Sequence, residues 1–199
     1  MRIKTRSALL LVAFFVAGCA SAPGNEMTAY IGVGAPKHYD VWVEVFELEA
    51  SGVRHWRRPM GSVSCCWKGP HGPTGKGGGP MKPFPKYIGI RWFSFAEQKF
   101  YERVFSLPEG LEEKMRSHAN YTTSMGTFSR PRDILTIGLA PGGQMVLWIS
   151  NQIGNEIEVG RRQANEVGGD VSNYEVGTRN YLEEHSDYIE KHGGPTEGW

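Results

Sequence analysis

Apolar and polar residues alternate along several short stretches of the chain, with the period of two that is typical of β-strands. The clearest stretch, 40–49, is rich in valine and aromatic residues. A turn at 50–52 separates it from a second β-rich stretch at 53–58, so the two predict a hairpin. The first strand is expected to carry different residues on its two faces: Val41, Val43 and Val45 on one, and Trp42, Glu44 and Phe46 on the other.

The strongest hairpin signal lies in the second half of the chain. Two β-rich stretches, 133–140 and 144–150, flank Pro141-Gly142-Gly143, where glycines adopt positive φ angles at little cost. A further turn leads into 156–161, and the three stretches together predict an antiparallel meander. The same criteria predict shorter strands at 62–67 and 86–93, whereas 98–105 fits either a short helix or a strand.

Helical signals lie outside these strands. Ser106 and Glu109 have the spacing of a capping box and predict a helix through His118. A second helix is expected from Asn180 to His192, where a Gly-Gly-Pro sequence supplies a stop. The predicted fold is therefore α+β and β-rich: an antiparallel sheet, arranged as a meander or a sandwich, with one or two peripheral helices.

The segment 69–85 interrupts the pattern with six glycines and five prolines in seventeen positions. A structureless loop of this length is uncommon inside a compact domain and is usually either disordered or functional. We expect disorder first and an exposed partner-binding loop as the alternative. In that alternative, Lys76 and Lys82 are the candidate contact residues.

The N-terminus has the pattern of a lipoprotein signal. Three basic residues precede an apolar run of ten residues at 8–17, which is too short to span a bilayer. The run closes with Val16-Ala17-Gly18-Cys19, which resembles a lipobox, so Cys19 is expected to be lipidated and to become the first mature residue. The alternative is an ordinary signal peptide with an unrelated cysteine.

This pattern divides the chain into a signal peptide at 1–18, a lipidated tether at 19–26 and a single β-rich periplasmic domain at 27–199. No aspartate follows Cys19, and by resemblance to the lipoprotein sorting rule this favours the periplasmic face of the outer membrane. Removal of the signal leaves 19 basic against 21 acidic residues. This near-neutral balance argues against a nucleic-acid partner.

The other two cysteines, Cys65 and Cys66, are adjacent in the sequence. In the oxidising periplasm they can form a strained vicinal disulfide, and the alternative is two thiols on opposite faces of a strand. No spacing of cysteines and histidines matches a zinc site, and His185 and His192 are best explained as a solvated helix face. Neither a nucleophile elbow nor a phosphate-binding loop is present, so we expect no catalytic residue, no cofactor and no metal.

Six tryptophans are spread over nearly every predicted strand. Most are expected in the core, because large aromatic side chains contribute much of the stability of a small β-domain. One or two exposed tryptophans could anchor a partner.

Three groups of short motifs carry a family resemblance: Cys65-Cys66; Ile90-Arg91-Trp92-Phe93-Ser94 with Lys99-Phe100-Tyr101 and Leu107-Pro108; and Gly138-Leu139-Ala140-Pro141-Gly142-Gly143 with Val146-Leu147-Trp148. Through these motifs and its lipobox, the chain resembles a family of short bacterial lipoproteins that is defined only as a domain of unknown function. The resemblance runs from about residue 62 to residue 158. That family has no accepted catalytic residues.

The resemblance also implies a function. Some members or close relatives are encoded beside phospholipase effectors of the type VI secretion system and act as immunity lipoproteins that bind and block the toxin in the periplasm. We therefore expect a binding protein that is not an enzyme, with a lipase toxin encoded nearby as its partner. The alternative is an envelope-maintenance or ligand-binding lipoprotein that has no toxin partner.

Overall fold

A computed structural model describes residues 28–65, 67–68 and 77–199 of the chain. In chain order its elements are β1 (Ala29–Gly34), β2 (Val41–Ala50), β3 (Arg54–Arg57), β4 (Gly61–Val63), β5 (Gly77–Met81), β6 (Tyr87–Ser94), β7 (Lys99–Ser106), α1 (Leu111–Arg116), β8 (His118–Thr123), β9 (Gly126–Pro131), β10 (Ile134–Ala140), the 3-10 turn η1 (Pro141–Gly143), β11 (Gln144–Ser150), β12 (Ile157–Gln163), β13 (Asn165–Val167), the 3-10 turn η2 (Val171–Tyr174) and α2 (Glu175–His192).

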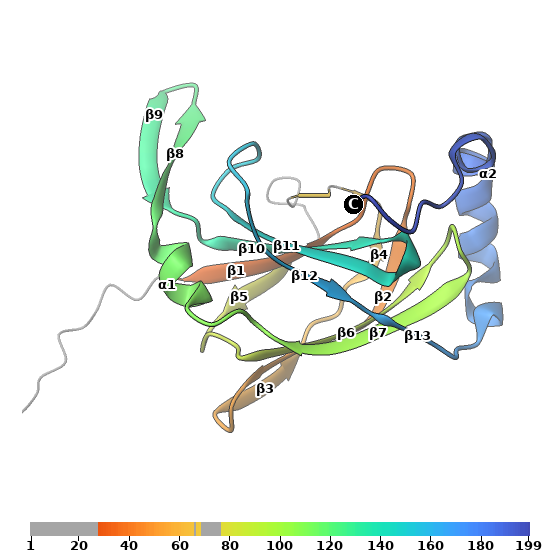
Figure 1. The fold of residues 1–199 in the computed structure, drawn as a ribbon, viewed down its shortest axis with the longest axis horizontal. Coiled ribbons are helices and arrows are strands. Elements are labelled where there is room, and N and C mark those ends of the chain that lie inside the picture. The colour runs from red at the N-terminus through yellow and green to blue at the C-terminus, as the bar shows by residue number, and fades with distance from the viewer. Residues whose placement is uncertain (1–27, 66, 69–76) are drawn as a thin grey trace, which may run out of the picture.

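Two β-sheets pack face to face and enclose the core (Figure 1). One sheet has the strand order β12-β11-β10-β1-β5, and the other has the order β13-β7-β6-β2-β3, with β4 paired to β2. Apolar side chains from both sheets form one continuous cluster, which contains residues of every strand in the centre of each sheet. The predicted α+β, β-rich class with mostly antiparallel sheets is confirmed.

The predicted meander forms one side of the first sheet. β10 pairs antiparallel with β11, and β11 pairs antiparallel with β12. Gly142 (φ 71°) and Gly143 (φ 73°) provide the left-handed backbone of the tight connection between β10 and β11, as their positions in the sequence predict. β1, for which no strand was predicted, pairs parallel with β10 on the other side.

Part of the Gly/Pro-rich segment is a strand rather than a loop. β5 pairs antiparallel with β1, from Ala29↔Met81 to Gly32↔Gly77. The expectation of a structureless segment is therefore wrong for Gly77–Met81. The strand tolerates Pro80 because β5 lies at the edge of its sheet, where one side of the backbone needs no partner strand.

A register shift in β2 overturns the predicted assignment of its faces. Val43 is buried, but the pairing with β6 shifts between Val43 and Val45. A bulge of this kind moves every later side chain to the opposite face. Phe46 is consequently buried in the core, whereas Trp42, which was expected on the same face, is exposed.

The remaining strands of the second sheet follow the sequence pattern closely. β3 forms the predicted hairpin with β2, and β6 reproduces the stretch predicted at 86–93. The ambiguous stretch at 98–105 is a strand, β7, which pairs with β6 along its whole length. The strand expected at 62–67 is shorter, because β4 ends at Val63.

Helix α1 is much shorter than predicted. It spans six residues, and its N-cap, Gly110, makes no side-chain capping hydrogen bond. The capping box expected from Ser106 and Glu109 is therefore wrong. His118 begins β8 instead of closing a helix, since the chain leaves the helical conformation at Ser117.

Helix α2 ends at His192 as predicted but begins at Glu175, five residues before Asn180. It packs against the outer face of the second sheet at one end (Figure 1). There Tyr181 joins Phe93 and other aromatic side chains in a second apolar cluster that is separate from the main core. Contacts with the sheet, rather than a strong local start signal, hold the first turns of the helix in place.

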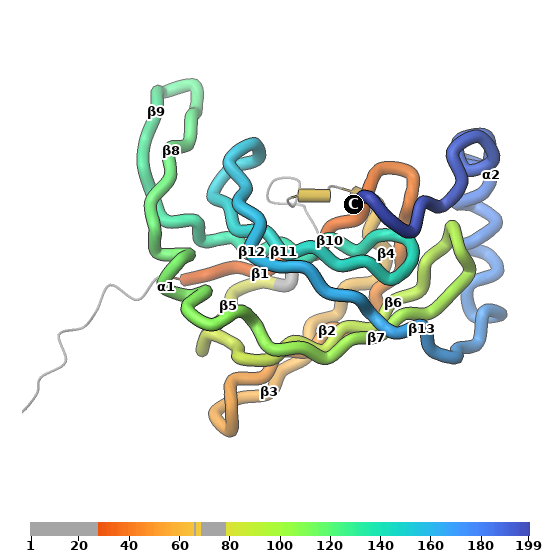
Figure 2. The backbone as a smooth tube through the Cα atoms, in the orientation of Figure 1, coloured from red at the N-terminus to blue at the C-terminus, as the bar shows by residue number. Residues whose placement is uncertain are grey.

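The two ends of the sandwich differ in what they carry (Figure 1, Figure 2). The first described residues enter β1 beside α1 and the β8–β9 hairpin, and we call this the near end. Helix α2 lies at the opposite end, which we call the far end. No helix in the described part of the chain is long and apolar enough to cross a membrane.

The six tryptophans occupy different environments. Trp92, Trp148 and Trp56 are buried, and Trp67 and Trp199 are half-buried at the edge of the core. Trp42 alone among the six is exposed, with 40% of its surface accessible. An exposed tryptophan is a candidate anchor for a ligand or partner.

Candidate functional site

The β8–β9 hairpin stands away from the sandwich at the near end (Figure 1). Its strands pair in unbroken register from His118↔Pro131 to Thr123↔Gly126 and form a sheet of their own. Only Ser124 and Met125 lie between them. A single two-stranded hairpin is marginally stable in water, so this one needs support from the rest of the protein.

Gln152, in the turn between β11 and β12, supplies part of that support. Its side-chain Nε2 donates to the Thr122 carbonyl oxygen at 2.8 Å, and its Oε1 accepts from the Thr122 amide at 2.9 Å. The amide group thus bonds to the free edge of β8 as a third strand would. It both stiffens the hairpin and protects its exposed edge.

Asn151 holds the base of the hairpin. The residue is 3% exposed, and its Nδ2 donates to the carbonyl oxygens of Ala119 at 2.9 Å and Arg130 at 2.8 Å. The Arg130 guanidinium in turn donates to the Asn151 carbonyl oxygen at 2.7 Å. Asn155 adds a bond from its Nδ2 to the Asn120 carbonyl oxygen at 2.9 Å. Both hairpin strands are therefore fixed to the main sheet.

The two faces of the hairpin differ chemically. One face carries Tyr121 opposite Phe128, with ring centres 5.7 Å apart, and the Arg130 guanidinium lies 4.7 Å from the Tyr121 ring. The other face carries hydroxyl groups, including Thr122 and Thr127, whose Oγ1 atoms are 3.1 Å apart. The projecting element is thus aromatic on one side and polar on the other.

Three apolar side chains are exposed on the hairpin and on the turn that supports it. Met125 is 84% exposed, Phe128 44%, and Ile153, in the supporting turn, 60%. We call these three residues the tip surface. Residues 118–131 contain no aspartate or glutamate. An apolar surface on a braced, projecting element is typical of a protein-binding site, because little conformational entropy is lost when it docks.

One titratable group lies at the root of the hairpin. Asp133 lies two residues after the end of β9, and burial raises the pKa of its carboxyl group, an effect that the nearby Arg130 partly offsets. The described residues contain no group of three or more His, Cys, Asp or Glu side chains arranged to hold a metal ion. His185 lies with its Nδ1 3.4 Å from that of His38, at the far end.

The residues singled out from the sequence are distributed as follows. Cys19, Cys66 and Lys76 lie outside the described residues, so lipidation and the vicinal disulfide stay predictions. Cys65 is half-buried shortly after β4. Lys82 is exposed just beyond β5, and because Met81 pairs with Ala29 at the start of β1, it lies at the near end. The structure does not join it to the tip surface.

The sequence alone did not predict the hairpin. A signal was present, because threonine, tyrosine and phenylalanine favour strands and Gly126 stands where the chain reverses. The helix predicted before it ends at His118, the first residue of β8, so the capping-box spacing accounts only for the misassigned start of the hairpin. The polar supports could not be foreseen, since Asn151 and Gln152 lie more than twenty residues away along the chain.

Comparison with known proteins assigns the family. The family model for a "protein of unknown function (DUF2931)" matches residues 20–197. The chain belongs to the DUF2931 family. The resemblance to a domain-of-unknown-function family is thereby confirmed, over a longer region than the motifs alone covered. A search of curated proteins and a search of solved structures found no match.

Proposed function

We propose that this DUF2931 protein is a lipid-anchored, periplasm-facing binding protein, and specifically an immunity factor that binds and inhibits a phospholipase effector of the type VI secretion system. The observation that carries the proposal is the braced hairpin with its apolar tip surface. The resemblance of the sequence to a lipoprotein family supports the class of partner, a phospholipase.

The tip surface suits the active site of a lipase. A phospholipase must accommodate acyl chains, so the entrance of its substrate cleft is apolar. Burial of an exposed Met or Phe side chain contributes about 1.5–3 kcal/mol. Met125 and Phe128 on a pre-ordered hairpin can occupy such a cleft and exclude the substrate, and this function requires no catalytic residue in the inhibitor.

The anchor would place the hairpin where the toxin acts. A tether of residues 19–26 spans at most about 28 Å when fully extended. β1, the first described strand, begins at the near end, the end that carries the hairpin. Lipidation of Cys19 would thus hold the tip surface close to the phospholipids under attack, at the inner leaflet of the outer membrane, and would raise its local concentration there.

Co-expression with the neighbouring phospholipase gene tests the proposal. We expect the wild-type protein to protect cells in which the phospholipase is directed to the periplasm. Met125→Asp is expected to abolish protection, because a carboxylate buried without a partner costs at least about 3 kcal/mol, roughly a hundredfold in Kd. Val176→Asp, an equally drastic change of an exposed side chain on α2 at the far end, is the matched control and should still protect.

Two outcomes would overturn the proposal. Equal killing with and without the wild-type protein would exclude immunity and favour an envelope-maintenance or ligand-binding lipoprotein. Full protection by Met125→Asp would exclude the tip surface as the inhibitory element. A Cys19→Ser variant, which is expected to protect less at equal abundance, separates the contribution of the anchor from that of the hairpin.

A further inference from the structure

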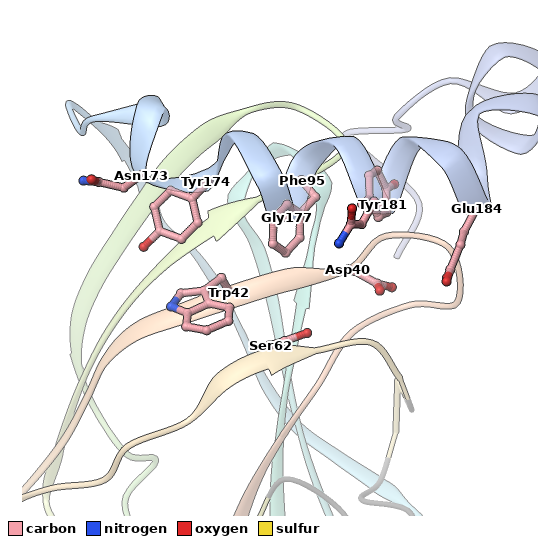
Figure 3. A pocket seen from close by; sticks show the side chains of 10 residues that line it. Asp40, Trp42, Ser62, Phe95, Asn173, Tyr174, Gly177, Tyr181 and Glu184 are labelled. Atoms are coloured by element: carbon pink, nitrogen blue, oxygen red, sulfur yellow. The ribbon is translucent and has the colours of Figure 1, made fainter.

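A groove at the far end is independent of the hairpin. It runs between α2 on one side and β2 and β4 on the other, and it has a volume of about 330 Å³ (Figure 3). Cavities of this size accommodate small ligands or single side chains. Its lining comprises Asp40, Trp42, Ser62, Phe95, Asn173, Tyr174, Gly177, Asn180, Tyr181 and Glu184.

One end of the groove is aromatic. Trp42 projects from β2 toward α2, and its ring centre lies 6.2 Å from that of Tyr174 (Figure 3). Tyr174 is fixed, because its hydroxyl donates to Glu44 Oε1 at 2.6 Å and its ring stacks on Phe93 at 4.4 Å. The exposed indole of Trp42 thus lies in a groove whose opposite wall is ordered.

The other end of the groove is acidic. Asp40, the residue just before β2, and Glu184, on α2, face each other across it (Figure 3). Within the described part of the chain, no side chain donates a hydrogen bond to the Asp40 carboxylate. Burial raises the pKa of this group to about 6, His185 opposes the shift, and Glu184 adds to it. The lining contains no lysine or arginine, and the cationic group that an ion pair brings to Glu184 is the His185 imidazole, with Nε2 3.8 Å from Glu184 Oε2.

We propose that this groove binds an organic cation, an ammonium or guanidinium group on an apolar stem, with the cation between Asp40 and Glu184 and the stem against Trp42. A cation is attracted both by the two carboxylates and by the face of an indole ring. The apolar stem covers aromatic surface that is otherwise exposed to water. An anion would meet two like charges, and a neutral ligand would leave the half-buried Asp40 carboxylate without a partner.

A close contact between α2 and the sheet forms one wall of the groove. Gly177 faces Phe95 across the contact between α2 and the sheet, and a Cβ atom at residue 177 would lie 3.0 Å from the Phe95 ring. The glycine therefore lets α2 approach the sheet closely enough to form one wall.

Such a cation has two sources, a free amine or the end of a Lys or Arg side chain of another protein. Calorimetric titration of the purified protein at pH 7.5 distinguishes them. The probes are agmatine and cadaverine for free amines, and N-acetyl-arginine amide for a side chain. N-acetyl-citrulline amide, in which a neutral urea replaces the guanidinium, is the matched control ligand.

We expect saturable binding of at least one cation, with a Kd on the order of a millimolar, and at least tenfold weaker binding of the citrulline analogue. Trp42→Ala and Glu184→Gln should each weaken cation binding at least fivefold. Glu183→Gln, the same charge change one residue away on α2 and outside the lining, should bind like the wild type. Tighter binding of agmatine points to a free amine, and tighter binding of blocked arginine points to a protein side chain.

The proposal would be overturned by the absence of binding for all three cations at 50 mM ligand, a concentration roughly fiftyfold above the expected Kd. Equal affinity for the arginine and citrulline compounds would also overturn it. So would cation binding that Trp42→Ala and Glu184→Gln leave unchanged. Trp42 and Glu184 are exposed, so neither change should unfold the protein, and circular dichroism checks this directly. None of these results depends on the hairpin or on a phospholipase.

Discussion

Replacement of Asn151 by alanine should release the hairpin without unfolding the sandwich. The side chain makes two bonds to carbonyl oxygens, one on each hairpin strand, and its Oδ1 accepts from Asn155 Nδ2 at 2.6 Å. A buried hydrogen bond contributes about 1 kcal/mol, and a carbonyl left without a partner costs about 1–3 kcal/mol. The free energy that favours the docked hairpin over the detached one should therefore fall by about 2–4 kcal/mol.

Native-state hydrogen exchange measures this loss directly. A change of 2–4 kcal/mol lowers the protection of hairpin amides by roughly 30- to 1000-fold. Amides of β10 and β11 should keep most of their protection, because detachment of the hairpin leaves their pairing intact. Asn173→Ala, at an exposed asparagine of the far end, serves as the control and should leave the hairpin unchanged.

Two results would refute the reasoning. Unchanged protection at residues 118–131 would show that Asn151 does not hold the hairpin. An equal loss of protection across both sheets would show that the hairpin does not open as a separate unit.

Further predictions concern the core, the groove and the aromatic cluster. Gly138→Ala should lower the free energy of unfolding by about 1–3 kcal/mol in urea titration, because the new Cβ would lie 2.6 Å from the rings of Trp148 and Trp67. Asp40→Asn should raise the melting temperature at pH 7.5 but not at pH 4. The folded-state pKa of about 6 lies above the ordinary 3.8, so wild-type stability is full below pH 4 and falls as the carboxyl ionises. Tyr174→Phe should cost about 1–2 kcal/mol by chemical denaturation, because it leaves Glu44 without its hydroxyl donor.

Local signals in the sequence predicted those elements whose structure is set locally. The connection at Gly142-Gly143 requires positive φ angles, and the flanking stretches have strong β-propensity, so β10 and β11 were found with nearly correct bounds. The period of two also located β2. Its faces were assigned wrongly because a bulge depends on the pairing with β6, which the sequence of β2 does not contain.

Elements that depend on distant partners were missed. β5 is made of residues that disfavour strands, and it forms because β1, about fifty residues earlier, offers a free edge. The first turns of α2 precede its strongest local signal, and they are held by the aromatic cluster on β6 and β7. The groove was missed for the same reason, because Trp42 and Glu184 come from opposite ends of the described chain.

Inhibition of the neighbouring phospholipase by the purified protein tests the central claim most directly. Hydrolysis of fluorescent phospholipid vesicles is followed as the wild type, Met125→Asp or Val176→Asp is added. The account predicts that the wild type and Val176→Asp inhibit at near-equimolar amounts and that Met125→Asp requires at least about a hundredfold more protein. Undiminished hydrolysis with an excess of wild type, or equal inhibition by Met125→Asp, would contradict it.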